Sequence, residues 1–334
     1  MLSDSIEGGI RDVSNERSWS LIMVGKTEYF LNLTLANAKH FVSRLGLDSL
    51  MSVHFLNRGL KILREEGWRS FIESAKKYAI KRYEVLKAKA RHWRYQHKWG
   101  RSAPIPDKLI HIDPDDVEFK TKPRFGKDIS TIGTHIIGGS WDQNILSQGG
   151  SIKERGLVKF EDTTFYQSCY NHFTNGVAWE DTKRYQEVVE SGKSIRPSRG
   201  TMKIEDRFVA LDKLYHEMEN RGYMTQRELL NEEQRYFSPR SYPKPEYHEV
   251  EMVIGRDGTL IHDDGSHRFT IARLLGIENI PVRILVRHEK WQQIREEVAM
   301  ASSIVELSSD AKSHLHHPDM LEFSGNIDGG FKDK

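Results

Sequence analysis

The segment 264–268, with the sequence Asp-Gly-Ser-His-Arg, constrains the fold most, because regular elements are predicted on both sides of it. Upstream, residues 249–254 and 259–262 are rich in β-favouring side chains and are separated by a glycine turn, which predicts two strands. Downstream, residues 269–275 carry apolar side chains at helical spacing and end at a glycine. A further strand is predicted over 280–286. This order predicts an α/β (α+β) domain with a small mixed β-sheet and helices.

The turn itself has the features of an anion-binding site. A helix that follows a glycine turn presents free backbone N–H groups and the positive end of its dipole. His267 and Arg268 add donors at this helix start, where cations oppose the dipole unless an anion lies between them. The other interpretation is a tight turn held by an ion pair between Asp264 and Arg268, which adds little net stability. We therefore predict a phosphate- or nucleotide-binding turn made of Gly265, Ser266, His267 and Arg268.

The order of strand, Asp-Gly-x-His-Arg, helix, Leu-Gly-Ile and Ile-Pro-Val-x-Ile resembles the ParB/sulfiredoxin-like superfamily over residues 247–287. Members of that superfamily include chromosome-partitioning CTPases, sulfiredoxin and archaeal free-serine kinases, and they use the helix-opening turn to bind nucleotide phosphates. The turn is most similar to those of ParB-like domains and free-serine kinases. The resemblance implies a sheet and helices of ParB/sulfiredoxin type. Sulfiredoxin needs a cysteine in the turn where this chain has Ser266, so we do not expect its reductase activity.

The chain of 334 residues is long enough for more than one structural unit. Pro104 and Pro106 mark a boundary, and the stretch around Asp113 predicts a strand followed by an Asx-turn and helix N-cap. The predicted organisation is an N-terminal region 1–103 with a long basic amphipathic helix, a ParB/sulfiredoxin-like domain 104–300 (core 108–123 and 204–300, insertion 124–203) and a flexible tail 301–334.

Positive charge is concentrated in residues 58–101, which hold fourteen Lys and Arg against four Glu in a chain of net charge +2. Residues 68–99 contain no proline or glycine, which predicts one long helix whose end alternates basic and aromatic residues. Such a helix is typical of contact with nucleic acid, of docking on a membrane surface, or of a solvated helix whose aromatic side chains pack on its own domain. For an anionic partner, the predicted contacts are Arg91, Arg94 and Lys98.

The predicted insertion is dense in aromatic residues next to acidic ones. This composition is typical of a pocket for a polar substrate, and also of ordinary half-buried helix faces. The predicted pocket residues are Trp141, His135 and Trp179. Phosphotransfer to a hydroxyl group needs a group that accepts its proton, and the candidate catalytic carboxylates are Asp142, Glu161 and Asp264.

Cys169 is the only cysteine, which rules out an internal disulfide and a cysteine-based zinc site. The chain start has neither the basic residues nor the apolar run of a signal peptide. No apolar run approaches the ~20 residues of a membrane-spanning helix. We expect a cytoplasmic protein, with peripheral membrane association if the basic helix meets a bilayer. The sequence identifies no metal site and does not indicate the oligomeric state.

Our first functional hypothesis is a nucleotide-dependent, kinase-like phosphotransferase that acts on a hydroxyl-bearing small molecule or on a glycan- or lipid-linked acceptor. The expected cofactor is Mg²⁺ with ATP, ADP or CTP. The alternatives are a ParB-like nucleic-acid-binding protein, a CTP-binding switch without a small-molecule substrate, and a non-catalytic anion-binding scaffold. Salt separates the first two, because DNA binding through several phosphates weakens by about 10³-fold or more between 50 and 200 mM salt.

Overall fold

The computed structural model describes residues 50–146, 155–191, 204–232, 244–325 and 327. Predictions for residues 1–49, and for the parts of the insertion and tail between these ranges, lie outside the described residues. The chain divides into two compact units, Met1–Ala79 and Ile80–Lys334. Helix α2 (Leu50–Trp99) runs through the division, and Gly67, with φ 82° and ψ 179°, separates two helical stretches within it. The long helix predicted over 68–99 is confirmed, whereas the predicted domain boundaries stay predictions.

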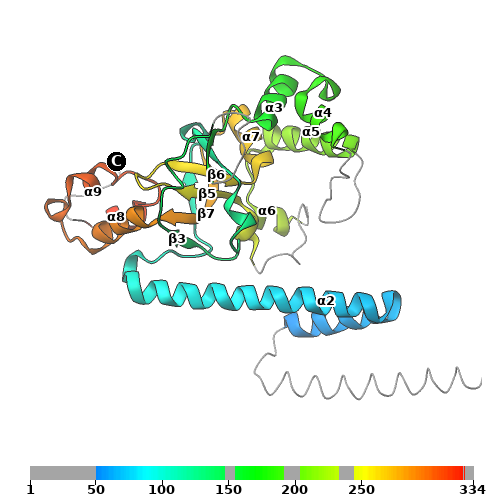
Figure 1. The fold of residues 1–334 in the computed structure, drawn as a ribbon, viewed down its shortest axis with the longest axis horizontal. Helices are drawn as coiled ribbons and strands as arrows, with labels where there is room; N and C mark the ends of the chain where they lie inside the picture. The colour runs from blue at the N-terminus through cyan, green and yellow to red at the C-terminus, as the bar shows by residue number, and fades with distance from the viewer. Residues whose placement is uncertain (1–49, 147–154, 192–203, 233–243, 326, 328–334) are drawn as a thin grey trace, which may run out of the picture. The chain divides into compact units, whose positions relative to one another are not determined.

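The second unit contains a seven-stranded mixed sheet (Figure 1). Its strands are β1 (Leu109–Ile112), β2 (Phe119–Lys122), β3 (His135–Ile137), β4 (Gly156–Lys159), β5 (Val250–Ile254), β6 (Leu260–Asp264) and β7 (Ile280–His288). The strand order is β1-β7-β5-β6-β2-β4, and β3 pairs with the second half of β7. The pairs β7–β5, β6–β2 and β3–β7 are parallel, and the other pairs are antiparallel. The predicted α+β class with a mixed sheet is therefore confirmed.

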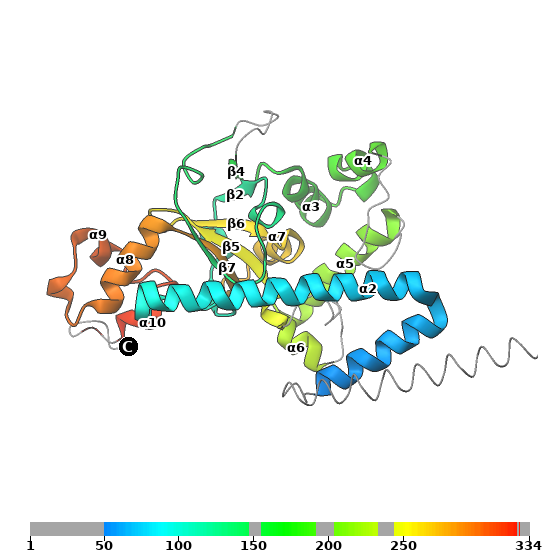
Figure 2. The same cartoon turned by 60° about the horizontal axis from the view of Figure 1, so that its bottom comes forward.

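Helices pack on the sheet and at both of its ends (Figure 2). The α-helices of the second unit are α3 (Thr164–Asn175), α4 (Lys183–Glu190), α5 (Ile204–Arg221), α6 (Gln226–Asn231), α7 (Ser266–Leu274), α8 (Glu289–Met300), α9 (Ser309–Ser313) and α10 (Leu321–Ser324). Single 3-10 turns are η1 (Gly100–Ser102), η2 (Pro114–Asp116), η3 (Phe125–Lys127), η4 (Trp179–Asp181), η5 (Pro245–His248) and η6 (Ile304–Glu306). In η2, the Asp113 carboxylate accepts a hydrogen bond from the backbone N–H of Asp115 at 2.9 Å, as the Asx-turn prediction requires. Within the described ranges, no helix has both the length and the apolar character needed to cross a bilayer.

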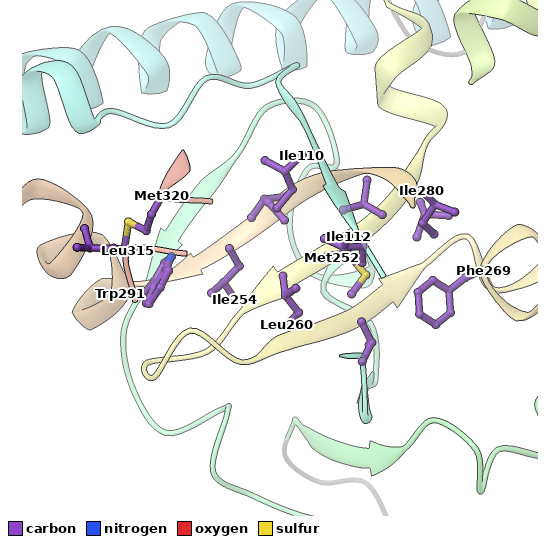
Figure 3. Packing of buried hydrophobic residues seen from close by; sticks show 14 of the residues in the cluster. Ile110, Ile112, Met252, Ile254, Leu260, Phe269, Ile280, Trp291, Leu315 and Met320 are labelled. Atoms are coloured by element: carbon purple, nitrogen blue, oxygen red, sulfur yellow. The ribbon is translucent and has the colours of Figure 1, made fainter. Parts of the chain in front are cut away.

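One face of the sheet carries the main apolar core. Alternate residues of β5 and β7 point to this face, where α7, α8 and the C-terminal segment cover them. Figure 3 shows part of this cluster, with Ile110, Ile112, Met252, Ile254, Leu260, Phe269, Ile280, Trp291, Leu315 and Met320 labelled. Because strands and covering helices come from distant parts of the sequence, this cluster ties residues 109–327 into one unit.

The opposite face is mixed in character. Val253, Ile261 and Leu285 form a smaller apolar cluster there with Phe125 and Trp141. Beside that cluster lie three buried charged side chains, which are Glu251, Asp263 and Arg283. Arg283 forms an ion pair with Glu251 and donates hydrogen bonds to the carbonyls of Thr131 and Gly133, both at 2.9 Å. Burying charges is costly unless they are paired or hydrogen-bonded, and these contacts offset that cost in the polar part of this face.

The segment around the Asp-Gly turn folds as the sequence predicts. Strands β5 and β6 form the predicted hairpin, α7 follows, and β7 completes the unit. Gly276 adopts φ 65°, and the backbone N–H of Ile277 bonds the carbonyl of Ala272 at 3.0 Å, which is the hydrogen bond of a Schellman cap. In the β5–β6 turn, a Cβ on Gly258 would lie 2.7 Å from the Trp291 ring, so this glycine permits close packing.

The C-terminal segment differs from the expected flexible tail. Residues 301–325 include η6, α9 and α10, and the two helices pack beside α8. Leu307, Ala311, Leu315, Met320 and Phe323 are buried in the main core. This segment is ordered because these apolar side chains meet the surface of α8 that would otherwise be exposed.

Candidate cationic cleft

A cleft of about 1380 Å³ lies within the second unit where α7 begins. Its walls come from β2, β4, α3, α4, α5 and the first residues of α7. Helices α3 and α5 both contact α7, which places the three-helix group α3–α5 beside this end of the sheet (Figures 1 and 2). We call this hollow the cationic cleft.

Positive charge exceeds negative charge in the cleft. Nine basic side chains line it, namely Lys120, Lys122, Arg124, Lys127, Lys159, Lys183, Arg184, Arg207 and Arg268. Six acidic side chains line it, namely Asp162, Glu187, Glu249, Glu251, Asp263 and Asp264. Four of these acids form ion pairs with arginines, namely Glu187 with Arg184, Glu249 with Arg268, Glu251 with Arg283 and Asp264 with Arg124. Lys122, Lys127, Lys183 and Arg207 have no ion-pair partner among the described residues, so the cleft favours an anionic ligand.

The N-terminus of α7 opens into this cleft without a side-chain cap. The first backbone bond of the helix runs from the N–H of Phe269 to the carbonyl of Gly265 at 3.2 Å. The N–H groups of Ser266, His267 and Arg268 precede that bond and have no partner within the helix. These three amides and the helix dipole form the anion-binding arrangement that the sequence predicts.

Gly265 permits this arrangement for two reasons. Its φ of 88° lies in the left-handed region, which side chains with a Cβ rarely adopt. A Cβ at this position would also lie 3.0 Å from the Cα of Val250 on the neighbouring strand. The glycine therefore sets both the direction of α7 and its close approach to β5.

Lys120 contacts the first residue of α7. It extends from β2, and its Nζ donates a hydrogen bond to the Oγ of Ser266. Burial lowers the pKa of Lys120 to about 8, and the nearby Arg124 and Arg184 lower it further, while Asp263 opposes them. An ammonium group that is surrounded by other cations is suited to bind an incoming anion.

Beneath the amides, the cleft has a buried polar floor. The Oδ1 of Asp263 accepts hydrogen bonds from the Thr121 hydroxyl and from the backbone N–H of Phe125, the latter at 2.7 Å. The Oδ2 of Asp263 and the Oε2 of Glu251 are buried without a hydrogen-bond partner among the described residues. Burial raises the pKa of Glu251, and the neighbouring Asp263 raises it further, against the opposing charge of Arg283. Asp263 thus links β6 to β2, Glu251 links β5 to β7, and both balance part of the positive charge of the cleft.

The structure brings the predicted turn residues together in the cleft but gives them different environments. The Arg268 guanidinium is held inside the protein, because it donates to Glu249 at 2.7 Å and to the carbonyl of His248, and it lies 5.3 Å from the ring centre of Tyr223. Its predicted contact with phosphate stays a prediction, and its charge is already balanced by Glu249. His267 also lines the cleft, and burial together with the charges of Arg207, Arg184 and Lys120 lowers its pKa to about 4. His267 is therefore a neutral donor at pH 7.

Asp264 is the one predicted catalytic carboxylate that lines the cleft. Its Oδ1 accepts a hydrogen bond from the backbone N–H of Gly265 at 2.9 Å, and its Oδ2 forms an ion pair with Arg124. Its side chain remains 43% exposed, which leaves a face of the carboxylate open to a ligand.

The other two predicted carboxylates lie outside the cleft lining. Asp142 binds Arg256 through both carboxylate oxygens, with Nη2 to Oδ1 at 2.7 Å, and accepts a bond from the Arg256 backbone N–H at 2.7 Å. Although burial opposes it, the hydrogen bonds from Arg256 lower the pKa of Asp142. Glu161 pairs with Arg273 at 2.8 Å on the surface. Both carboxylates hold neighbouring elements together rather than face the helix N-terminus.

The predicted substrate-pocket residues also lie elsewhere. Trp141 packs edge-on against Phe125, with ring centres 5.1 Å apart. Trp179 donates to Asp212 at 2.7 Å within the aromatic cluster of α3–α5. The His135 ring bonds the carbonyl of Ser130 at 2.8 Å, and burial lowers its pKa to about 4. Each of these side chains has a packing role, which agrees with the second interpretation of the composition, that of half-buried structural residues.

On α2, the three predicted anion contacts have separate environments. Arg91 donates to the carbonyls of Thr134 at 2.9 Å and Ile132 at 2.7 Å, so it fastens the end of α2 to the loop before β3. Arg94 is exposed, and Lys98 lies 3.9 Å from Glu289. An anionic partner for this helix stays a prediction.

Sequence reasoning missed the lysines of β2 and the basic residues of α4 and α5. A signal for the first was present, because Lys120 and Lys122 alternate in a strand and therefore point to the same face. Arg184 and Arg207 carry no local signal, since only the packing of α3–α5 beside α7 brings them to the cleft.

Asp142→Ala is expected to lower the free energy of unfolding by about 2 kcal/mol, because a largely buried charged hydrogen bond is lost. Urea denaturation measures the loss, and the exposed Asp116→Ala serves as the control. If Asp142→Ala lost no more stability than Asp116→Ala, the contact with Arg256 would not hold these elements together.

Comparison of the chain with family models, with curated proteins and with solved structures finds no match. The ParB/sulfiredoxin-like resemblance therefore stays a prediction that rests on the residues of the turn and its flanks.

Proposed function

We propose that the protein is a nucleotide-dependent phosphotransferase whose cationic cleft binds the polyphosphate of the nucleotide. One observation carries the proposal: the uncapped N-terminus of α7 opens into a cleft with a surplus of basic side chains. Backbone amides at a helix start and flexible lysines are the groups that commonly bind phosphates. The recessed form of the cleft suits a small ligand.

Within this proposal, each group near the turn has a role. The amides of Ser266, His267 and Arg268 and the ammonium of Lys120 bind phosphate oxygens. Asp264 accepts the proton of the acceptor hydroxyl, because it is the predicted catalytic carboxylate that lines the cleft and its side chain is partly exposed. Positioning and charge neutralisation supply most of the rate in phosphoryl transfer, which fits a site built from amides and cations.

Mg²⁺ is the metal that usually accompanies such a nucleotide, and it is bound through one or two carboxylates and the phosphates rather than by a protein cage. The described residues contain no group of three or more metal-ligating side chains, and Asp264 is the carboxylate beside the helix start. One carboxylate beside the helix start fits a Mg²⁺ ion that arrives with the nucleotide, and the ion would neutralise phosphate charge there.

A thermal-shift series with ATP, ADP, CTP and GTP, with and without Mg²⁺, tests the proposal. A nucleotide at about 100 times its dissociation constant adds about 2.7 kcal/mol of stability, which raises the melting temperature of a unit this size by roughly 5–10 °C. Lys120→Met should weaken binding by about tenfold or more. The exposed Lys312→Met is the matched control. The proposal fails if no nucleotide shifts the parent protein, or if only DNA binds and does so with steep salt dependence.

Nucleotide affinity should fall as the pH rises through the pKa of Lys120. With a pKa of about 8, Lys120 is mostly charged at pH 7 and mostly neutral at pH 9, because burial lowers its pKa. The affinity should therefore be about tenfold lower at pH 9 than at pH 7. Titration calorimetry at both pH values measures the change, and Lys120→Met should remove most of it. An equal fall in Lys120→Met would assign the pH dependence to another group.

A further inference from the structure

Residues 80–99 of α2 belong to the second unit and are fixed to it by one side of the helix. The Arg91 guanidinium donates to two carbonyls of the loop before β3, and the Tyr95 hydroxyl accepts a hydrogen bond from the backbone N–H of Ile136 at 3.0 Å (Figure 1). Ala88 is buried in a small cluster with Ile132. This attached side of the helix carries residues three or four positions apart, namely Glu84, Ala88, Arg91, Tyr95 and Trp99.

The opposite side of the same stretch carries a row of exposed apolar side chains. Tyr83, Leu86 and Trp93 are between 60% and 62% exposed, and Ala90 is exposed between them. Leu86 and Trp93 each lie two positions from residues of the attached side in both directions, and two positions are about half a turn of an α-helix. We call Tyr83, Leu86, Ala90 and Trp93 the outer stripe of α2. Exposed apolar residues are ordinary when they are scattered, but a contiguous row of them marks an interaction surface.

Positive charge borders the outer stripe along both of its edges. Residues seven positions apart lie on one line along a helix. Arg82 and Lys89 form such a line on one edge, and Lys87 and Arg94 form another on the opposite edge. All four side chains are exposed, and Arg82, Lys89 and Arg94 have no ion-pair partner in the described part of the chain. Lys87 lies 3.4 Å from Glu84, which is the one acidic residue in the sequence 80–99. The borders therefore carry positive charge that is largely unbalanced, and they favour an anionic surface.

An apolar stripe between two basic borders suits the surface of a membrane. Helices that lie in a membrane surface place Trp and Leu side chains against lipid, and their Lys and Arg side chains contact anionic headgroups. A nucleic acid fits this surface less well, because Leu86 lies within the stripe and offers neither a ring for base stacking nor a charge for phosphate.

We propose that the outer stripe of α2 docks the protein on an anionic lipid bilayer. Leu86 and Trp93 enter the boundary between headgroups and acyl chains, and the basic borders contact the phosphate and carboxylate groups of the lipids. This inference is independent of the proposed function, since no residue of 80–99 lines the cationic cleft.

Sedimentation of the full chain with lipid vesicles tests the inference. Vesicles of equal parts phosphatidylcholine and phosphatidylserine should bind the parent protein at least about tenfold more tightly than vesicles of phosphatidylcholine alone, since each basic residue near an anionic surface adds about fivefold. Leu86→Gln and Trp93→Gln should each weaken binding by about tenfold or more, because the apolar contact is lost. Arg82→Gln combined with Lys89→Gln should weaken it by about 20-fold. The matched controls are Met300→Gln, which changes an exposed apolar side chain on α8, and Lys312→Gln, which changes an exposed cation on α9, and both should bind like the parent.

Binding of the parent protein to neither kind of vesicle, or unchanged binding of Leu86→Gln and Trp93→Gln, would overturn the inference. Binding of duplex DNA in place of vesicles, with its loss in the Arg82→Gln and Lys89→Gln double variant, would assign the helix to nucleic acid. A concentration-dependent dimer that Trp93→Gln abolishes would assign the stripe to a second copy of the chain, if vesicles do not bind. A lower melting temperature of Leu86→Gln without lipid would show that another part of the chain covers Leu86. In all these variants, ADP affinity should stay within about twofold of the parent, so a failure to bind ADP counts against the proposed function alone.

Discussion

Replacing Asp319 by alanine is expected to lower the free energy of unfolding by about 3–5 kcal/mol, because two buried arginines would lose their shared counter-ion. Asp319 is 2% exposed. Its carboxylate accepts hydrogen bonds from Arg287 at 2.6 and 2.9 Å and from the indole N–H of Trp291 at 3.0 Å. Arg295 lies 3.0 Å away and also bonds the Asp319 carbonyl. These charges lower the pKa of Asp319 well below its usual range despite its burial.

Urea denaturation monitored by circular dichroism measures the loss. Asp310→Ala is the control from the same segment, because its side chain is 68% exposed and lies 3.6 Å from His314 in a surface pair. That change should cost less than about 1 kcal/mol. If Asp319→Ala lost no more stability than Asp310→Ala, the C-terminal segment would not be fastened to α8 and β7 by this network.

The C-terminal segment shows a limit of sequence reasoning. Its apolar residues Leu307, Ala311 and Leu315 recur at helical spacing, but the regular structure that they form is very short. Besides these apolar contacts, the segment is held by Asp319, which pairs with Arg287 on β7 and Arg295 on α8. Nothing near either arginine in the sequence indicates that Asp319 is its partner. Burial of charge depends on tertiary contact, which a local pattern does not contain.

The hairpin, helix and strand around the Asp-Gly turn were predictable for the opposite reason. Glycine turns, alternating strands and a glycine cap are decided by neighbours in the chain, and β5, β6, α7 and β7 follow one another directly. Asp142 and Glu161 are candidates from the sequence because acidic residues stand beside aromatic ones in this region. Composition does not tell whether an acidic residue beside an aromatic one lines a cleft or joins two elements. In the structure, Asp142 and Glu161 each bind an arginine.

The cleft itself depends on long-range contacts. Lys120 is 146 positions from Ser266, and the parallel pairing of β2 with β6 brings them together. The sequence therefore predicted the amides of the site, which are local, and missed most of its cations. Because the amides depend on α7 alone, a substitution at the first residue of this helix can change the charge beside them and leave the fold intact.

Ser266→Asp should abolish most nucleotide binding without loss of stability. A carboxylate at the first position of α7 is favourable to the helix dipole, and it lies beside Lys120, so the melting temperature should hold or rise by the equivalent of about 0.3–1 kcal/mol. The same carboxylate repels phosphate and occupies the amides, and like-charge contact of this kind costs several kcal/mol, or about 100-fold or more in affinity. Ser266→Ala is the matched control, since it removes the hydroxyl and leaves the amides free, and its affinity should fall by less than about tenfold. Thermal shift with ADP and Mg²⁺ measures both quantities. A stable Ser266→Asp protein that binds nucleotide like the parent would place the phosphates away from the start of α7, because a negative charge at that position cannot share three amides with a polyphosphate.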